Sequence, residues 1–289
     1  LLNHPEPKGT ELLEEALTEI VQAAELQPEE PEVHYLAGMI YWQQGQLPTA
    51  AKNWEHTIKL DPTFRRAYGY LGTAYHEMGD IYRAIESFDG YFACGNTYDA
   101  NEDPRPITIH FSLANCYFDK GNFEKAAEHF RACVSIAPDF QQAQYNLALS
   151  LYSLARYEEA LPPMLQAISL NPNHFSARAQ LGVIYAFLER FDEALRECEL
   201  ARSLRPYDPS NIISIGNISI ELGDYLRAKE SYLQALDLKS TSIYQISLHL
   251  MSKRNPRLLS TEKIVQVLEA AFKPLLALAD TNVLEELEK

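Results

Sequence analysis

Small residues recur along this chain of 289 residues at a nearly constant interval. The first set is spaced by 34, 42, 34, 34 and 34 residues, and it comprises Gly38, Gly72, Ala114, Ala148, Gly182 and Gly216. A second set follows twelve residues later each time, and it comprises Ala50, Ala84, Ala126, Ala160, Ala194 and Ala228. This spacing puts one small residue on each of two antiparallel helices, where the backbones can approach closely. The chain is therefore predicted to be a stack of helix pairs.

The rest of the repeating unit supports helix pairs of this kind. A large side chain stands four residues after each alanine of the second set: Trp54, Phe88, Phe130, Met164, Cys198 and Tyr232. Four turn-forming residues precede these alanines by four positions, and each follows a glycine: Gln46, Asp80, Asn122 and Asp224. Glycine supplies the positive φ that ends one helix, and the next residue can cap the following helix. Prolines at four unit ends stop the second helix: Pro62, Pro138, Pro172 and Pro206.

This 34-residue pattern of a small residue, Tyr, Ala, an aromatic residue and Pro resembles the tetratricopeptide repeat over about residues 31–240. The resemblance implies an all-α fold, a right-handed α-α superhelix of six repeats that presents surfaces and rarely performs chemistry. Residues 1–30 are expected to form an N-terminal capping helix (a half repeat), and residues 241–289 are expected to form C-terminal capping helices. The 42-residue interval predicts an insertion near residues 94–106, where Gly, Asn, Asp and Pro favour a polar loop.

In this family the first helix of each repeat lines a concave groove through its second, fifth, sixth, ninth, twelfth and thirteenth positions. Eight of the thirty-six residues at these positions are aromatic, and the charged ones are Glu32, Arg66, Glu77, Asp119 and Glu221. The fifth and sixth repeats contribute Ser176, Ala179, Gln180, Val183, Ala186, Phe187, Ser210, Ile213, Ser214, Asn217, Ile220 and Glu221.

An apolar, aromatic-rich groove is costly to leave in water, so we expect something to cover it. We expect an apolar or mildly basic segment of a partner protein, bound as a peptide or helix by Tyr35, Trp42, Tyr70, Phe111, Asn115, Phe118, Tyr145, Asn146, Tyr152 and Phe187. The alternatives are that some of these residues pack between neighbouring helices, that the chain's own C-terminal helices occlude the groove, or that a second copy covers it.

One subtype of the family, which clamps the C-terminal carboxylate of heat-shock chaperones, is disfavoured. Asn115 and Asn146 match its asparagines, but Phe111, Ser176 and Gln180 stand where that clamp needs cations. A carboxylate would be desolvated there without compensation.

The charge of the chain excludes other classes of partner. It has 25 Lys and Arg against 40 Asp and Glu, a net charge of −15. Binding to nucleic acid or to an anionic membrane surface needs a basic stripe, so neither is expected. No run of about 18 apolar residues suggests a membrane span. The scattered cysteines (Cys94, Cys116, Cys133 and Cys198) fit a reducing compartment, or a core that needs no disulfides, and a cytoplasmic location is expected.

Signatures of catalysis are missing from the sequence. It contains no HExxH, GxSxG, GxxxxGK[ST] or GxGxxG motif, and its eight histidines are dispersed. His34 and His110 occupy equivalent repeat positions, where packing is the expected role. We therefore expect no enzymatic activity, no metal and no cofactor. Two alternatives are a targeting arm of a larger enzyme, such as a glycosyltransferase with these repeats, and a bacterial envelope or pilus assembly factor.

Overall fold

The computed structural model describes residues 8–95 and 105–238. The chain divides into two compact units, residues 1–150 and residues 151–289, and each is described by itself. The capping helices expected in residues 241–289, and most of the polar loop expected near residues 94–106, lie outside the described residues.

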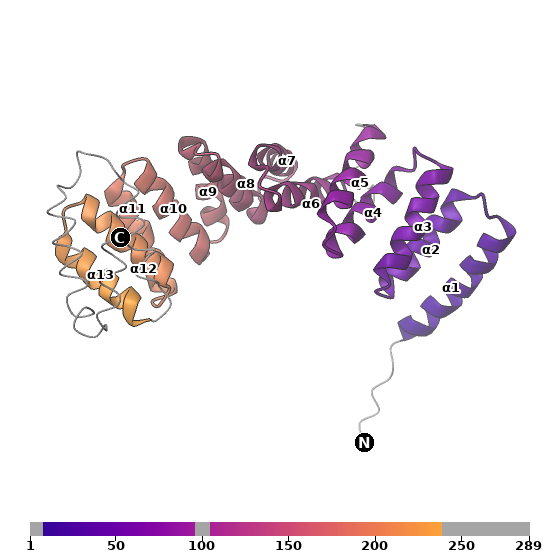
Figure 1. Cartoon of the computed structure of the whole chain (residues 1–289), viewed down its shortest axis with the longest axis horizontal. Coiled ribbons are helices and arrows are strands. Elements are labelled where there is room, and N and C mark those ends of the chain that lie inside the picture. Colours follow the sequence, from indigo (N-terminus) through magenta and orange to yellow (C-terminus); the bar gives the residue numbers. More distant parts are fainter. Residues whose placement is uncertain (1–7, 96–104, 239–289) are drawn as a thin grey trace, which may run out of the picture. The chain divides into compact units, whose positions relative to one another are not determined.

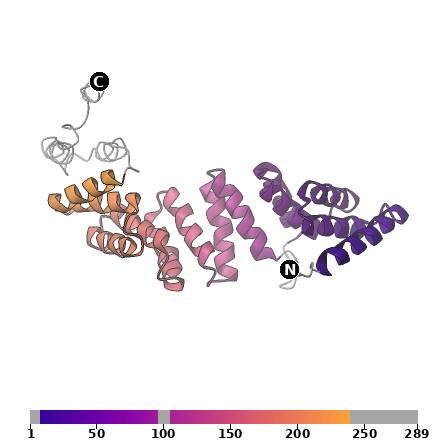
Figure 2. The same ribbon diagram turned by 90° about the horizontal axis from the view of Figure 1, so that it is seen from below.

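The described residues are α-helical throughout, with short turns between the helices. The helices of unit 1 are α1 (Lys8–Leu26), α2 (Pro31–Gln43), α3 (Leu47–Leu60), α4 (Arg65–Glu77), α5 (Ile81–Ala93), α6 (Pro106–Asp119) and α7 (Phe123–Ile136). Helix α8 (Gln141–Ser153) contains the boundary, and unit 2 continues with α9 (Tyr157–Leu170), α10 (Phe175–Phe187), α11 (Phe191–Leu204), α12 (Pro209–Glu221) and α13 (Tyr225–Asp237). In each unit, helices that follow one another in the chain lie side by side (Figures 1 and 2).

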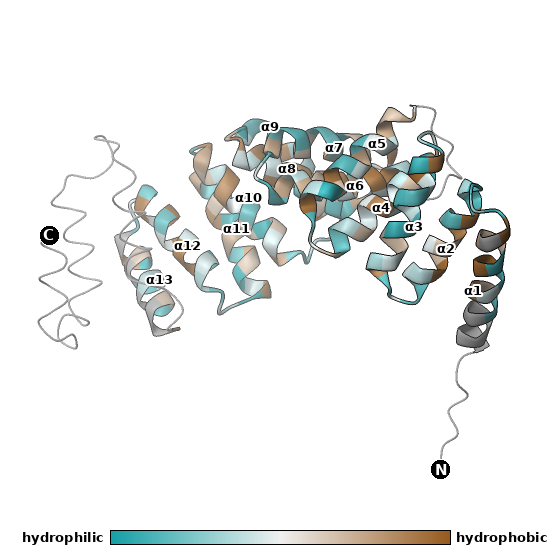
Figure 3. Cartoon of the chain, turned by 45° about the vertical axis from the view of Figure 1, so that its right-hand side comes forward, coloured by the Kyte–Doolittle hydropathy of each residue, from teal (hydrophilic) through white to brown (hydrophobic). Residues whose placement is uncertain are grey.

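The small and large residues of the repeat meet across each helix pair. A methyl group added at Gly72 on α4 would lie 2.5 Å from ring carbons Cδ1 and Cε1 of Phe88 on α5. Gly38 faces Trp54 in the same way, Gly182 faces the Cys198 sulfur, and Gly216 faces Tyr232. The six alanines of the second set and the six large side chains are all buried. The coloured parts of the helices carry both hydrophilic and hydrophobic residues (Figure 3).

The turns inside the repeats follow the expected chemistry with one exception. Gly45, Gly79, Gly121 and Gly223 have φ between 73° and 79°. The Oδ1 atoms of Asp80, Asn122 and Asp224 each accept a hydrogen bond from a backbone N–H of the next helix, at 3.1–3.3 Å. Gln46 does not cap α3, because its longer side chain donates to the Gln44 side chain instead. In the fourth and fifth repeats, Ala155 and Glu189 take the positive φ without a glycine.

A pair of histidines, of which His110 is buried and His129 is half-buried, joins α6 to α7. The Nδ1 atoms of His110 and His129 lie 2.9 Å apart, so a neutral ring donates its proton to the other neutral ring. Phe92 on α5 packs on His110 with ring centroids 4.5 Å apart, and Tyr117 stacks on His129 at 5.9 Å. Burial, the neighbouring His129 and Arg65 lower the pKa of His110 to about 4, and burial also lowers the pKa of His129. His110 thus has the packing role that its repeat position predicts.

Gly72→Ala should destabilise the protein, although alanine is the better helix former. The added methyl group would force Phe88, which is fully buried, out of its position. We expect a loss of about 2 kcal/mol in the free energy of unfolding, measured by urea denaturation. The double variant Gly72→Ala, Phe88→Leu should recover part of that loss, because the leucine leaves room for the methyl group. A Gly72→Ala variant as stable as the parent would contradict this account of the helix contact.

Ala155→Gly and Glu189→Gly should each stabilise unit 2. An L-residue at positive φ costs about 1–2 kcal/mol, and glycine's greater freedom in the unfolded chain offsets part of the gain, so about 0.5–1 kcal/mol should remain. The matched control is the reverse change, Gly79→Ala, where no atom lies within 4 Å of the added methyl group and only the backbone is strained. The control should lower the urea midpoint while the two glycine variants raise it.

The histidine pair should make the fold sensitive to acid. The pKa of His110 is lower in the folded state than its ordinary value near 6.5. As the pH falls below 6.5 towards 4, the unfolded chain therefore binds more protons at this residue than the folded chain does. Stability from this group is therefore present at neutral pH and should fall by about 2 kcal/mol at pH 5. His110→Phe should show a smaller loss of stability between pH 7.5 and pH 5 by urea denaturation.

The charged neighbours of the pair, Arg65, Asp89, Lys125 and Glu128, are present in both the parent and His110→Phe, so their own charges do not produce this difference. His76→Gln, a change at a histidine outside the pair, is the matched control. If His110→Phe and the parent lose stability equally, the pair is not the acid-sensitive group.

Candidate functional site

Two of the tyrosines expected to contact a peptide are instead core residues of unit 1. Tyr35 and Tyr70 are only 4% and 5% exposed. The Tyr70 ring stacks on Trp54 with centroids 5.5 Å apart and meets Trp42 edge-on at 5.3 Å. Tyr35 packs on Phe64 at 5.1 Å and on Tyr70 at 6.1 Å. The prediction that these two rings are peptide contacts is wrong, because each lies in the interface between the first two repeats.

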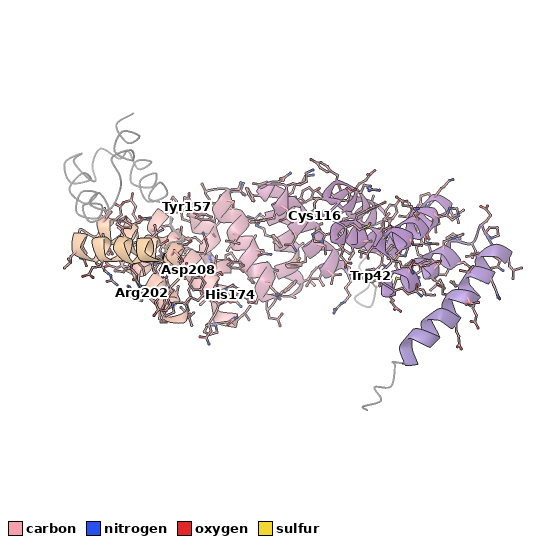
Figure 4. The ribbon with its side chains drawn as sticks, turned by 60° about the horizontal axis from the view of Figure 1, so that its bottom comes forward. Trp42, Cys116, Tyr157, His174, Arg202 and Asp208 are labelled. Atoms are coloured by element: carbon pink, nitrogen blue, oxygen red, sulfur yellow. The ribbon has the colours of Figure 1, made fainter. Side chains whose placement is uncertain are left out.

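Trp42, labelled in Figure 4, belongs to the same aromatic cluster, because its ring contacts those of Trp54 and Tyr70. It is half-buried, and its indole Nε1 donates to Glu77 Oε2 at 3.5 Å. Glu32 and Arg66 form an ion pair at 3.1 Å, and the Arg66 guanidinium also lies 4.7 Å from the centre of the Tyr35 ring. The charged residues of α2 and α4 expected in the groove thus contact one another or the aromatic cluster.

Helices α6 and α8 bring the two asparagines together within unit 1. Asn146 Nδ2 donates to Asn115 Oδ1 at 3.2 Å, and both side chains are half-buried. This bond uses one N–H and one carbonyl lone pair, so each amide keeps further hydrogen-bonding capacity. Phe111 packs on Phe140 at 4.8 Å and Phe118 on Phe123 at 5.2 Å. Phe111, Phe118 and Tyr145 are all half-buried.

Unit 2 contains a cleft of about 240 Å³ on the first helices of the repeats. Its lining comes from α8, α10 and α12, and consists of Tyr152, Val183, Ala186, Phe187, Ser214, Asn217, Ile218 and Glu221. All of these except Ile218 stand at positions that the resemblance assigns to the groove. The repeat rule therefore names seven of the eight lining residues as groove positions and leaves out one isoleucine.

Three aromatic rings stand together at this cleft. Phe187 is 46% exposed, and its ring stacks on Tyr157 with centroids 4.6 Å apart and planes 10° apart. Tyr152 meets both rings at 5.7 Å, and burial raises the pKa of its hydroxyl group. Tyr157, labelled in Figure 4, begins α9, a second helix, and so the groove rule did not identify it.

The cysteines do not have the properties of nucleophiles. Cys116, Cys133 and Cys198 are buried, and burial raises the pKa of each thiol to about 12. A thiol that remains protonated at neutral pH is a poor nucleophile and a poor metal ligand. Within residues 8–95 and 105–238, no three His, Cys, Asp or Glu side chains are grouped so as to hold a metal ion. In the same part of the chain, no helix is both long enough and apolar enough to cross a bilayer.

Comparison with known proteins gives one family along the chain. Four tetratricopeptide repeat models match, over residues 11–55 and 145–209, residues 38–79, residues 107–140 and residues 211–242. A curated relative, the human protein O-mannosyl-transferase TMTC1, is 26% identical over 135 residues. This match takes in 46% of the chain but only 15% of the length of the relative.

Similar solved structures share the same fold. YrrB, described as a TPR protein with an unusual peptide-binding site, is 18% identical with a TM-score of 0.61, over 67% of this chain and 95% of YrrB. MamA MSR-1 is 24% identical with a TM-score of 0.52, over 61% of this chain and 96% of MamA. At these identities the likeness concerns the fold alone. With its 34-residue repeat, its paired helices and the matches along its length, the chain belongs to the tetratricopeptide repeat family.

Proposed function

We propose that this chain is a non-catalytic protein-interaction scaffold that holds a peptide or helix of a partner protein against the first helices of its repeats. The observation that carries the proposal is the cleft in unit 2, because its lining is mostly apolar and is built from groove positions of three successive repeats. A cleft with a few polar groups among apolar side chains is the usual form of a binding site.

Phe187 and Tyr152 are the proposed anchors. An aromatic ring that is 46% exposed still has apolar surface to bury against a partner. Stacking on Tyr157 holds the Phe187 ring in place before a partner arrives, which lowers the conformational entropy lost on binding. Aromatic side chains of this kind dominate the energetics of most protein interfaces.

The surface of unit 1 offers a second set of contacts in the proposal. Trp42, Phe111, Phe118 and Tyr145 are half-buried, so each exposes part of a ring. The amides of Asn115 and Asn146 would hydrogen-bond the backbone of a peptide and so give affinity with little sequence preference. Tyr35 and Tyr70 have no place in this surface, because they are buried.

The similarity to TMTC1 favours a second candidate, in which this chain is the repeat region of a larger protein. The repeats would then bring a partner to another domain. An immunoblot of the source cells with an antibody against residues 105–238 would detect a polypeptide larger than 32.8 kDa. A single band at that mass would contradict this second candidate.

Phe187→Ala should weaken peptide binding at this cleft. The probe is a set of peptides selected from a random-peptide phage library on the immobilised full chain and then measured by isothermal titration calorimetry. Loss of an anchoring ring is expected to cost about 1.4–3 kcal/mol, so the dissociation constant should rise at least about tenfold. Tyr152→Ala should act in the same direction.

Tyr82→Ala is the matched control, because Tyr82 is 75% exposed but lies on α5, a second helix, and is not among the residues that line the cleft. It should leave the dissociation constant unchanged, and far-UV circular dichroism should show equal helix content in all variants. Selected peptides that bind the Phe187→Ala variant as tightly as the parent would exclude the cleft as the binding site.

A further inference from the structure

The cleft in unit 2 has a distinct charge pattern. Among its lining residues, Glu221 is the one acidic side chain, and none is Lys or Arg. Aromatic and aliphatic side chains make up most of the rest, with Phe187 and Tyr152 from neighbouring helices. A single carboxylate beside apolar walls distinguishes this cleft from a purely hydrophobic groove.

Two neutral polar side chains of the cleft form hydrogen bonds within the protein. Ser214 Oγ donates to the carbonyl oxygen of Ser210 at 3.0 Å, one turn earlier on α12. Asn217 Oδ1 accepts a hydrogen bond from the Tyr232 hydroxyl at 2.7 Å. Burial and the nearby Glu221 carboxylate both raise the pKa of Tyr232, so that hydroxyl group stays neutral. Glu221 is thus the one formally charged side chain among the residues that line the cleft.

The mostly apolar lining of the cleft, with one carboxylate, suits a long basic side chain. Lys and Arg bury an apolar stem while the charged head remains at a polar group. In this cleft the stem would pack on Val183 and Ala186, and the head would pair with Glu221 close to the aromatic rings, which also attract cations. The net charge of −15 adds attraction at long range for a basic segment and repels an acidic one.

We propose that this cleft is a specificity subsite that takes a Lys or Arg side chain of the partner segment, with Glu221 as its counter-ion and with Val183 and Ala186 against its stem. The proposal rests on the proposed function, because it names the chemistry that the same cleft selects. In this proposal the rings of Phe187 and Tyr152 supply binding affinity, and the Glu221 carboxylate selects a partner with a basic residue.

The test uses the phage-selected peptides described above, with the full chain. The peptides should contain Lys or Arg next to an apolar residue more often than the unselected library does. Replacement of that basic residue by norleucine, and the Glu221→Gln variant, should each raise the dissociation constant about five- to tenfold, and the two changes together should cost no more than either alone. Glu221→Lys should restore binding to peptides in which the basic residue is replaced by Glu.

The matched control is Glu158→Gln, which removes the same charge from an exposed position on α9 outside the cleft. It should leave the dissociation constant unchanged at physiological salt, so that any effect of net charge is separated from that of the subsite.

The outcomes separate this inference from the proposed function. Peptides that lose affinity with Phe187→Ala but have no basic preference and ignore Glu221→Gln would overturn the subsite and leave the scaffold proposal standing. Failure to select any binding peptide would overturn both. Sedimentation that shows a dimer of the full chain, weakened by Glu221→Lys, would also overturn the subsite, since a second copy would then occupy the cleft.

Discussion

The fold depends on the close approach of two helices at one small residue in each repeat. At Gly72 there is no room for a methyl group, since the Phe88 ring already occupies that space, and Gly38, Gly182 and Gly216 meet their partners in the same manner. The large residue on the second helix fills the volume that the missing side chain leaves, and so both residues must repeat together. Once the two helices of a repeat are fixed in this way, the first helix presents the same positions to the surface in each repeat.

That regularity explains how much of the molecule follows from sequence. The helix pairs, the positive φ of Gly79 and the burial of Cys198 depend on residues inside one repeat, and the pattern predicts them. Most of the cleft lining also follows, because all of it except Ile218 stands at groove positions on α8, α10 and α12.

Other features depend on which side chains neighbouring repeats supply. Tyr35 and Tyr152 occupy groove positions, yet Tyr35 is buried, because Phe64 and Tyr70 of the next repeat pack against it. Tyr152 instead meets Phe187 and Tyr157 at the edge of the cleft. The repeat pattern fixes the backbone position from which an aromatic side chain extends. The residues of the adjacent repeat decide whether its ring is buried or exposed, and the repeat pattern does not specify those residues. The aromatic triad and the histidine pair therefore became visible only in three dimensions.

Tyr232 has two roles, and these make packing and recognition interdependent in the sixth repeat. Its ring fills the space beside Gly216, and its hydroxyl group holds the Asn217 amide, which lines the cleft. A ligand that binds one orientation of the Asn217 amide also favours the core packing in which the Tyr232 hydroxyl donates to that amide. By thermodynamic linkage, that core packing in turn increases the affinity for the ligand. The packing inside this repeat is thus coupled to the proposed binding surface, and under that proposal a substitution far from solvent would change the choice of partner.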